Sequence, residues 1–445
     1  MPNNNDTNNN NHEEHYCMVC KRGEKETGRQ LNLMGNMYIC IDCLEKYSKQ
    51  MSNQPINFMN IDKETLNSIL GGSSIVNQPD DYKSVDSQQD VADETEYTKI
   101  NINDVLRPHE IKAILDKYII GQDKAKKIIS VATYNHFKRI FNEDDSVEID
   151  KSNIIMVGPT GSGKTYLVKT LARILDVPLA ITDATSLTET GYIGDDIESV
   201  LSKLLDNAGN DVKKAEHGIV FIDEIDKIAK KQEMRTRDVS GEAVQQGLLK
   251  LLEGNKIQVP VGAGNKNLFT PQKTIDTKNI LFIVGGAFPG IENIVKERLK
   301  NCSSIGFNTQ YVDDDSKSLL SNIAMEDLRE YGMIPEILGR LPVLTTFDPL
   351  DIEALIKIVK EPQNAILKQY EKLFTIDGVK LIFEDEALRA VCEKAMKKNT
   401  GARALRAVIE DVLLDIMFEI PKDKNIKEVV ITKDYVNNEG GPIIR

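Results

Sequence analysis

Eight consecutive residues, Gly158–Thr165, read GPTGSGKT and match the pattern G-x-x-x-x-G-K-[ST] in full. Glycines at these positions let the backbone wrap closely, so that its N–H groups face a phosphate, and a helix that starts here adds a favourable dipole. Lys164 would reach the β- and γ-phosphates, and Thr165 would offer its hydroxyl to Mg²⁺. The run predicts a nucleotide site formed by Pro159, Thr160, Gly161, Ser162, Gly163, Lys164, Thr165 and Tyr166.

Two carboxylates, Asp223 and Glu224, directly follow the apolar run Ile219–Ile222. A carboxylate at the end of a buried strand can enter the coordination sphere of Mg²⁺, and we expect this of Asp223. Glu224 would polarise the attacking water as a general base. The pair could instead be two solvated acids favoured by a helix N-terminus. Its place downstream of a complete phosphate loop favours ATP hydrolysis, with ATP and Mg²⁺ as cofactors.

Four of the six cysteines form two close pairs near the N-terminus. Two residues separate Cys17 from Cys20 and Cys40 from Cys43, and 19 residues lie between the pairs. Two such pairs suit one tetrahedral Zn²⁺ held by four thiolates. A redox site of the thioredoxin type is the alternative, but it would use one pair within a larger βαβ fold. Closed four-thiolate sites are structural, so we expect no catalysis here.

Strand-like and helix-like runs alternate around the nucleotide motifs. Strands separated by helices predict an α/β fold, with a parallel sheet covered by helices on both faces. After Pro349 the pattern changes to a smaller, mostly helical α/β domain. The expected strands of the sheet are 153–157, 179–182, 218–222 and 280–284, and its helices 164–175, 197–205 and 239–252; the smaller domain is expected to hold helices 351–371, 384–398 and 402–418 and strands 379–383 and 428–432.

Composition narrows the class of protein. The chain has 445 residues, of which 40% are hydrophobic, and a net charge of −13. The hydrophobic content is that of a soluble globular protein, and the acidic balance argues against a main role in gripping nucleic acid. No apolar run reaches the roughly 18 residues of a membrane span, and the polar N-terminus does not resemble a secretory signal. We therefore expect a cytoplasmic protein with no membrane partner.

Further short motifs accompany the phosphate loop, and together they resemble the ClpX family of AAA+ ATPases, unfoldase rings that feed the ClpP protease. The resemblance covers nearly the whole chain and implies a homohexamer. It implies that Arg340 is an arginine finger for a neighbouring subunit's γ-phosphate, that Arg403 is a sensor arginine, and that Ile119 and Ile120 line the adenine pocket. From the residues alone, core packing is an equal alternative for the isoleucines, and surface ion pairing is one for the arginines. The motifs, in family order, are the cysteine module, Tyr118–Gln122, Gly158–Thr165, Gly191–Gly194, Thr236–Glu242, Ile305–Phe307, Ile334–Pro342 and Gly401–Arg403.

Two of these motifs would contact proteins. The resemblance makes Tyr192 and Ile193, between flanking glycines, a pore loop that grips substrate through apolar contact. It makes Ile305, Gly306 and Phe307 a loop that docks a protease. From composition alone, Tyr192 could pack on the core of its own domain, and Ile305 and Phe307 could fold back onto theirs.

One loop of this chain departs from the family pattern, and one residue expected in AAA+ proteins is not found. Members of the family carry a basic, His-containing loop at the pore mouth that helps receive tagged substrates. Here Gly264–Leu268 reads GNKNL, so Lys266 is its single charge and it holds no histidine. We also assign no polar sensor residue to Ile280–Gly286, because none is obvious there.

The expected function is that of an ATP-dependent unfoldase and translocase, which recognises substrates and feeds them to a ClpP-type peptidase and has no peptidase site of its own. Residues 16–50 are only slightly positive, which favours contacts with proteins over DNA. The resemblance implies that this zinc module receives substrates and adaptors. The alternative is an ATPase that remodels nucleic acid, such as a helicase loader. The expected segments are a disordered tail (1–15), the zinc-binding module (16–55), a flexible linker (56–100), the large AAA+ domain (101–348) and the small AAA+ domain (349–445).

Overall fold

The computed structural model forms two compact units, Met1–Thr95 and Glu96–Arg445. We describe each unit by itself. The structure describes residues 16–17, 19–27, 30–34, 37–43, 105–142, 146–147, 149–188, 195–229, 239–261, 271–303, 316–398, 401–423 and 425–445.

The first unit contains a short helix and two paired strands. Helix α1 is Glu24–Thr27, and strands β1 (Gln30–Met34) and β2 (Met37–Cys40) pair antiparallel. An isolated bridge joins Cys17 to Tyr38 of β2. Among the residues of this unit whose side chains are described, the one cluster of buried side chains is made of cysteines.

The second unit is built on a five-stranded parallel sheet whose strand order is β11-β3-β10-β7-β4. The three inner strands consist of apolar residues and glycine, except for Asp223 at the end of β7, as expected for strands buried on both faces. The carboxyl ends of the five strands therefore lie along one edge of the sheet and the amino ends along the other. The strands are β3 (Ile154–Val157), β4 (Leu179–Asp183), β7 (Ile219–Asp223), β10 (Leu281–Gly286) and β11 (Val343–Thr346).

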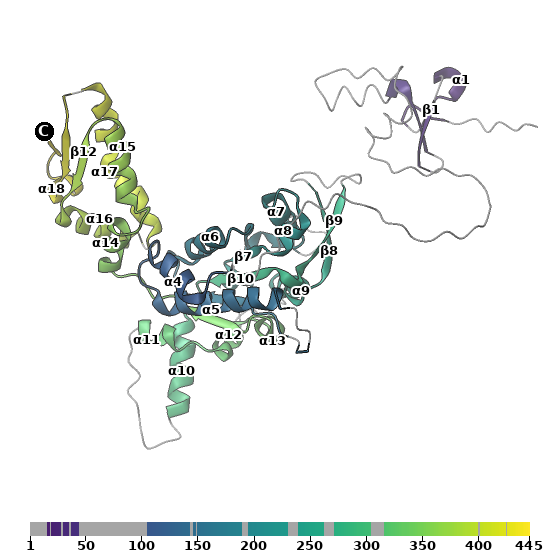
Figure 1. Cartoon of the computed structure of the whole chain (residues 1–445), viewed down its shortest axis with the longest axis horizontal. Helices are drawn as coiled ribbons and strands as arrows, with labels where there is room; N and C mark the ends of the chain where they lie inside the picture. Colours follow the sequence, from purple (N-terminus) through teal and green to yellow (C-terminus); the bar gives the residue numbers. More distant parts are fainter. Residues whose placement is uncertain are drawn as a thin grey trace, which may run out of the picture. The chain divides into compact units, whose positions relative to one another are not determined.

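Side chains of these strands alternate between two cores. Ile154 and Met156 of β3 pack in one core with helices α4 (Pro108–Asp116), α5 (Asp123–Ile140) and α6 (Lys164–Leu175). Ile155 and Val157 pack in the other, and Figure 1 shows the sheet between these helix layers. The second core holds α7 (Ser199–Asn207), α8 (Val212–Glu216), α9 (Val239–Glu253), α10 (Ile291–Ser303), α11 (Ser316–Ser321), α12 (Met325–Tyr331) and α13 (Pro335–Gly339).

Shorter elements connect this framework. Strands β5 (Leu187–Thr188) and β6 (Asp195–Asp196) pair parallel, and β8 (Lys256–Pro260) pairs antiparallel with β9 (Gln272–Asp276). The 3₁₀ turns are η3 (Ala184–Ser186), η4 (Ile225–Ile228), η5 (Thr277–Asn279) and η6 (Ile420–Lys422).

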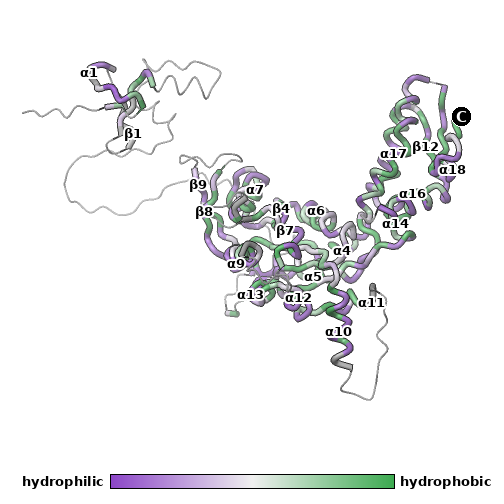
Figure 2. Tube along the Cα trace, turned by 180° about the vertical axis from the view of Figure 1, so that it is seen from behind, coloured by the Kyte–Doolittle hydropathy of each residue, from purple (hydrophilic) through white to green (hydrophobic). Residues whose placement is uncertain are grey.

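The C-terminal part of the second unit has its own core. Its helices share one cluster of buried apolar side chains with a three-stranded sheet of order β12-β13-β14. Hydrophobic and hydrophilic positions alternate along α17 in Figure 2, as they do in a helix with one buried face. The elements are α14 (Ile352–Lys360), α15 (Ile366–Ile376), α16 (Asp385–Lys397), α17 (Arg403–Glu419), α18 (Lys433–Val436), β12 (Lys380–Phe383), β13 (Glu428–Ile431) and β14 (Ile443–Ile444).

The predicted α/β class, with a parallel sheet and a smaller helical domain, is confirmed. The single helix predicted over 351–371 is wrong, because α14 ends at Lys360 and α15 begins at Ile366. Pro362 explains the break, since a proline has no backbone N–H and excludes the helical carbonyl four residues earlier. Several predicted segments lie outside the described residues: the tail 1–15, the linker 56–100, Tyr192 and Ile193, Ile305, Gly306 and Phe307, and Gly264–Leu268.

Candidate nucleotide-binding site and metal centre

The phosphate loop connects β3 to α6 at the carboxyl edge of the sheet (Figure 1). Its first glycine lies tightly against the segment that leaves β11. A Cβ atom on Gly158 would lie 2.6 Å from the carbonyl oxygen of Phe347, and the Phe347 N–H donates to Val157 at 2.7 Å. Gly161 and Gly163 have φ angles of +79° and +102°, which side chains disfavour. The sequence therefore needs glycine here for both packing and backbone shape.

Lys164 is held inside the loop. Its side chain is 7% exposed, and its Nζ donates to the carbonyl oxygens of Gly158 at 2.6 Å and Pro159 at 3.0 Å. Burial lowers the pKa of Lys164 to about 8, although Asp223 and Asp226 oppose that change. Negative charge in addition to that of Asp223 and Asp226, such as that of a nucleotide phosphate, would therefore favour the charged form of Lys164.

The predicted metal-binding pair is assembled. The Thr165 hydroxyl donates to Asp223 Oδ2 at 2.8 Å, so the two oxygens that would serve Mg²⁺ lie side by side. Hard cations such as Mg²⁺ prefer oxygen ligands, and the donors present fit one. Glu224 follows with φ +56° and ψ +34°, a left-handed backbone that is uncommon for a residue other than glycine. Its N–H donates to Asp223 Oδ1 at 2.9 Å, which fixes this turn.

Asp226 belongs to the same group of acids and was missed in the sequence. Its Oδ1 accepts the N–H of Ala287 at 3.0 Å, directly after β10, and its Oδ2 is buried without a partner among the described residues. A Cβ on Gly286 would approach Asp226 Oδ1 to 2.9 Å, so the strand end must be glycine. The available signal was a third carboxylate, three residues after Asp223.

Ile119 and Ile120 lie where α4 turns into α5. Ile119 is buried in the core beside α4, whereas Ile120 is half-buried. The next residues, Gly121 and Gln122, both have left-handed backbones. Gln122 then makes two hydrogen bonds of 2.9 Å to the backbone N–H and C=O of Asp348. This turn is thereby fixed to the chain that leaves the sheet for the C-terminal domain.

Helix α17 begins at the phosphate loop. The Ala402 N–H donates to the carbonyl of Gly161 at 3.4 Å, and a Cβ on Gly401 would lie 3.0 Å from the carbonyl of Thr160. Arg403, the first residue of α17, is exposed and contributes to lowering the pKa of Lys164. It therefore lies close enough to Lys164 for their charges to interact. A second contact joins the Tyr166 hydroxyl to Asn364 Oδ1 at 3.0 Å.

Arg340 lies at the opposite edge of the sheet. Its carbonyl accepts from Asn153 Nδ2 at 2.9 Å, and Asn153 immediately precedes β3. Its guanidinium is exposed and pairs with Glu253 at 3.3 Å. The four residues of β3 separate this point from the phosphate loop, roughly 13 Å at the rise of a strand. Among the residues predicted to act on the nucleotide, Arg340 therefore lies apart from the phosphate loop of its own chain.

The four paired cysteines converge within the first unit. The Sγ atoms of Cys17, Cys20, Cys40 and Cys43 all lie within 4.8 Å of one another, and those of Cys20 and Cys40 are 3.6 Å apart. A tetrahedral Zn²⁺ with Zn–S bonds of ~2.3 Å needs sulfurs roughly 3.8 Å apart, so the four donors fit this metal. No cysteine with a described side chain lies in a disulfide.

Cys392 is separate from this cluster. Its side chain is buried in the core of the C-terminal domain, where burial raises its pKa to about 11. The side chain of Cys302, the other isolated cysteine, lies outside the described residues.

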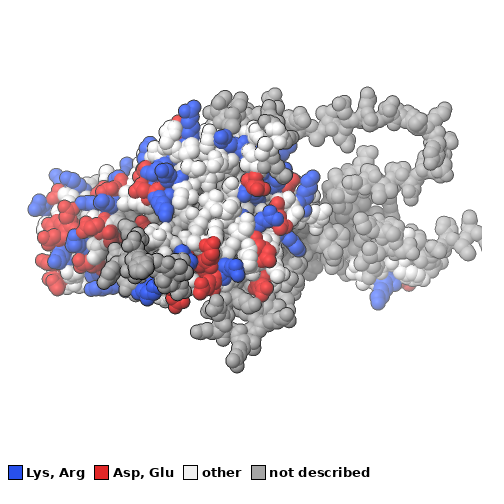
Figure 3. All heavy atoms as spheres, turned by 90° about the horizontal axis from the view of Figure 1, so that it is seen from below, with Lys and Arg blue, Asp and Glu red and all other residues white. Residues whose placement is uncertain are grey.

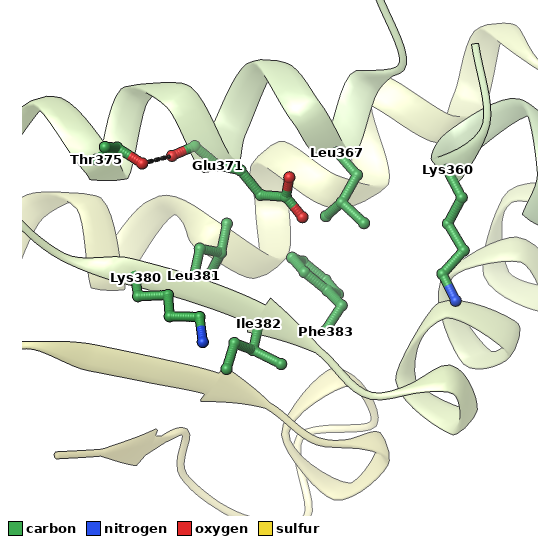
Figure 4. A pocket seen from close by; sticks show the side chains of 8 residues that line it. All are labelled: Lys360, Leu367, Glu371, Thr375, Lys380, Leu381, Ile382 and Phe383. Atoms are coloured by element: carbon green, nitrogen blue, oxygen red, sulfur yellow. Dashed lines mark hydrogen bonds between the residues drawn. The ribbon is translucent and has the colours of Figure 1, made fainter. Parts of the chain in front are cut away.

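A hollow of about 530 Å³ lies in the C-terminal domain between α15 and the edge strand β12 (Figure 4). Apolar side chains such as Leu367 and Phe383 line it together with Lys360 and Glu371. The Thr375 hydroxyl is turned back onto its own helix, donating to the Glu371 carbonyl at 2.6 Å. None of the residues predicted to bind nucleotide lines this hollow.

Charges of both signs are interspersed on the face drawn in Figure 3, and the described residues on that face form no continuous basic patch. In the part of the chain that the structure describes, no helix combines the length and apolar content needed to cross a bilayer.

Comparison with known families and curated proteins gives consistent results. Residues 149–344 match the family described as AAA domain (Cdc48 subfamily). Residues 350–433 match the C-terminal, D2-small domain of ClpB protein. These two matches meet near the point where β11 ends and the smaller domain begins.

Curated proteins match a longer continuous span of the chain than either family does. One is the ATP-dependent Clp protease ATP-binding subunit ClpX of Bacteroides thetaiotaomicron, 52% identical over 348 residues, which cover 77% of this chain and 84% of the relative. The protein of the same name from Borrelia duttonii is 53% identical over 337 residues, or 74% and 78% of the two chains. That from Bacteroides fragilis is 51% identical over 348 residues, or 77% and 83%.

Proposed function

The chain belongs to the ClpX family of AAA+ ATPases, and on that premise we propose that it unfolds protein substrates with the energy of ATP and passes them to a separate protease. It is an ATPase. One observation carries the assignment of the catalytic centre. Lys164, the Thr165–Asp223 pair and Glu224 lie together at the carboxyl edge of one parallel sheet, where α/β folds bind ligands.

The residues of this centre would divide the work of hydrolysis. Lys164 holds the terminal phosphates by charge, and Thr165 and Asp223 would hold Mg²⁺, which neutralises negative charge on the phosphates. Glu224 would orient a water molecule and accept its proton as the water attacks the γ-phosphorus, while the bond from that phosphorus to the bridging oxygen breaks and ADP leaves. The backbone of Glu224 is left-handed, and the hydrogen bond from its N–H to Asp223 fixes this turn. The turn therefore sets the direction in which the Glu224 side chain leaves the backbone.

Arg340 would act on the nucleotide of a neighbouring subunit. Its backbone lies at the amino edge of the sheet, one strand length from its own phosphate loop, which supports action on another copy. An arginine supplied in this way is worth ~10³–10⁵ in rate in related phosphoryl-transfer enzymes. We propose a homohexameric ring on this basis. Arg403, whose helix begins against the loop, would report nucleotide to the smaller domain.

The remaining assignments extend the same proposal. Cys17, Cys20, Cys40 and Cys43 would hold a structural Zn²⁺ in a module that receives substrates and adaptors. Tyr192 and Ile193 would grip substrate, and Ile305, Gly306 and Phe307 would dock a ClpP-type peptidase. Ile119 and Ile120 would face the adenine. We place the protein in the cytoplasm, with the segment boundaries given from the sequence.

Nucleic-acid remodelling is the competing function. The mixed charge of the surface in Figure 3 and the family relationship argue against it. The deciding experiment measures ATP hydrolysis with an unfolded protein, with single-stranded DNA, or with neither. We expect the protein to stimulate hydrolysis several-fold and the DNA to leave it unchanged. Stimulation by DNA alone would refute the unfoldase assignment.

Coupling to a protease needs a second experiment. The purified chain is mixed with a ClpP-type peptidase from its own source and a stable tagged substrate. We expect degradation that requires ATP and is lost in Phe307→Ala, while unfolding in the same preparation continues. Degradation by Phe307→Ala at the parent rate would remove Ile305–Phe307 as the dock.

A further inference from the structure

A buried glutamine, Gln245, connects two segments that both serve hydrolysis. It lies within α9 and is fully buried. Its Nε2 donates to the carbonyl of Ile228 at 2.8 Å, and its Oε1 accepts the N–H of Ile334 at 2.9 Å. A carbonyl can only accept and an N–H can only donate, so the two partners fix the orientation of the amide.

Each partner belongs to a functional segment. Ile228 ends η4, the turn that starts directly after Glu224 and contains Asp226. Ile334 caps α13, the short helix that ends immediately before Arg340. Gln245 therefore joins the turn behind the proposed general base to the start of the helix that carries the proposed finger.

The far end of α13 is also fixed. The carbonyl of Arg340 accepts from Asn153, a residue that is 1% exposed, and its guanidinium pairs with Glu253 at the end of α9. A helix held at both ends moves as a unit when one end moves, because packed interiors shift between discrete arrangements rather than deform smoothly. A displacement of η4 would accordingly reach Arg340 through Gln245.

We propose that Gln245 is a positioning residue for ATP hydrolysis. Through α13 it sets the position of Arg340 according to the state of the nucleotide site in its own subunit. That Arg340 then acts on the nucleotide of the neighbouring subunit. The inference rests on the proposed action of Arg340 on a neighbouring subunit. It assigns to one buried amide the link between successive sites of the ring.

A purely structural role would give different behaviour. Removal of a buried amide leaves its former donor and acceptor partners unsatisfied, and this destabilises the fold that contains them. That effect would lower activity wherever the altered subunit stood in the ring. A positioning role acts in one direction, since it matters only in the subunit that supplies the finger.

Mixed rings separate these roles. A Glu224→Gln copy binds ATP and supplies Arg340 but does not hydrolyse, and an Arg340→Ala copy hydrolyses only when its neighbour supplies the arginine. Each copy alone should be nearly inactive, and an equal mixture should recover hydrolysis. Failure of the mixture to recover would refute the action of Arg340 in trans, and with it this part of the proposed function.

Gln245→Met is then placed in either copy of a mixture that has recovered. In the Glu224→Gln copy we expect the rate to fall about 10- to 100-fold with little change in KM, since small misplacements of a catalytic group cost this much. In the Arg340→Ala copy we expect a fall of less than about threefold. Equal losses in both copies, or no loss in the first, would overturn the proposal while leaving the trans arginine in place.

A second variant guards against a folding defect. Ionised Gln245→Glu can still accept from Ile334 but cannot donate to the carbonyl of Ile228, whereas its protonated form can do both. Burial raises the pKa of a carboxyl group, so we expect hydrolysis by this variant, relative to the parent, to recover as the pH falls from 8 to 6. Gln245→Met should show no such recovery. A Gln245→Glu profile that stays parallel to that of Gln245→Met would overturn the proposal.

The matched control is Gln246→Met, the same substitution at an exposed position of the same helix. It should leave the rate of either mixture unchanged. A loss equal to that of Gln245→Met would show that the substitution acts through α9 in general, and would also overturn the proposal.

Discussion

The nucleotide site and the cysteine cluster are built by opposite means. The first lies at the edge of a sheet buried on both faces, where two apolar cores fix the loop, the strand end and the helix that follow. The second lies in a unit whose described cluster of buried side chains is made of its own four cysteines. The fold therefore positions the nucleotide groups before any ligand binds. In the cysteine unit, by contrast, we expect metal binding and folding to be one process.

The contrast explains which parts tolerate change. Loss of one group at the nucleotide site removes a chemical step while the sheet remains folded. Loss of one thiolate would remove a ligand of the proposed Zn²⁺, and we expect its unit to lose its fold. The expected effects of substitution accordingly differ in kind as well as in size.

Removal of metal should have the largest effect. Structural Zn²⁺ sites contribute ~10–16 kcal/mol in apparent binding free energy, so chelation or Cys40→Ser should unfold residues 16–43. The ATPase unit should keep its thermal midpoint. Hydrogen exchange across both units, with zinc content measured alongside, tests this. The control is Cys392→Ala, which should destabilise the C-terminal domain and leave the zinc content unchanged.

Glu224→Gln should have the next largest effect. The amide cannot accept the proton of the attacking water, so hydrolysis should fall by ~10²–10⁴. Nucleotide affinity should be retained, because Lys164 and the loop are untouched. Steady-state hydrolysis and equilibrium binding of ATP measure the two quantities. A variant that hydrolyses ATP at the parent rate would show that another group is the base.

Gly158→Ala should have a smaller effect that combines stability and binding. The new methyl would meet the Phe347 carbonyl at 2.6 Å, and overpacking of this kind costs about 1–3 kcal/mol. We expect a lower free energy of unfolding and weaker ATP binding, by urea denaturation and by titration. Gly441→Ala, where the methyl meets no atom within 4 Å, is the control and should change neither.

The pH dependence of nucleotide binding should be the mildest effect. The pKa of Lys164 is lowered by burial to about 8, while phosphates favour its charged form. Affinity should therefore be constant below pH 8 and fall above it, at most about tenfold per pH unit, because binding then requires uptake of a proton. Lys164→Arg, which stays charged, should show no such fall in titrations between pH 7 and 9.5. A parent profile that is flat up to pH 9.5 would contradict the lowered pKa.

Local sequence patterns predicted much of this molecule. Helix 164–175 has its predicted bounds, because an apolar strand, a glycine loop and an amphipathic helix follow one another there. The cysteine pairs predicted their own convergence. Each of these signals lies within a few residues of the feature that it predicts.

Contacts between distant segments could not be predicted in this way. Neither the packing of Phe347 on Gly158 nor the approach of Gly401 to Thr160 leaves a periodic pattern. Strand β11, which carries the chain past the loop, was also missed. Gln245 reads as one polar residue in a helix, and only the tertiary fold gives it two buried partners.

The placement of Arg340 and the phosphate loop at opposite edges of the sheet has a consequence for symmetry. If one copy's amino edge meets the next copy's carboxyl edge, the contact is heterologous, and each copy keeps one edge open until the last joins the first. A rotation that closes gives a ring, and one that fails to close gives a helical filament. A two-fold dimer does not satisfy this arrangement, because its copies would present the same edge to each other. The rotation between two neighbouring copies thus determines whether the assembly is a closed ring or an open filament.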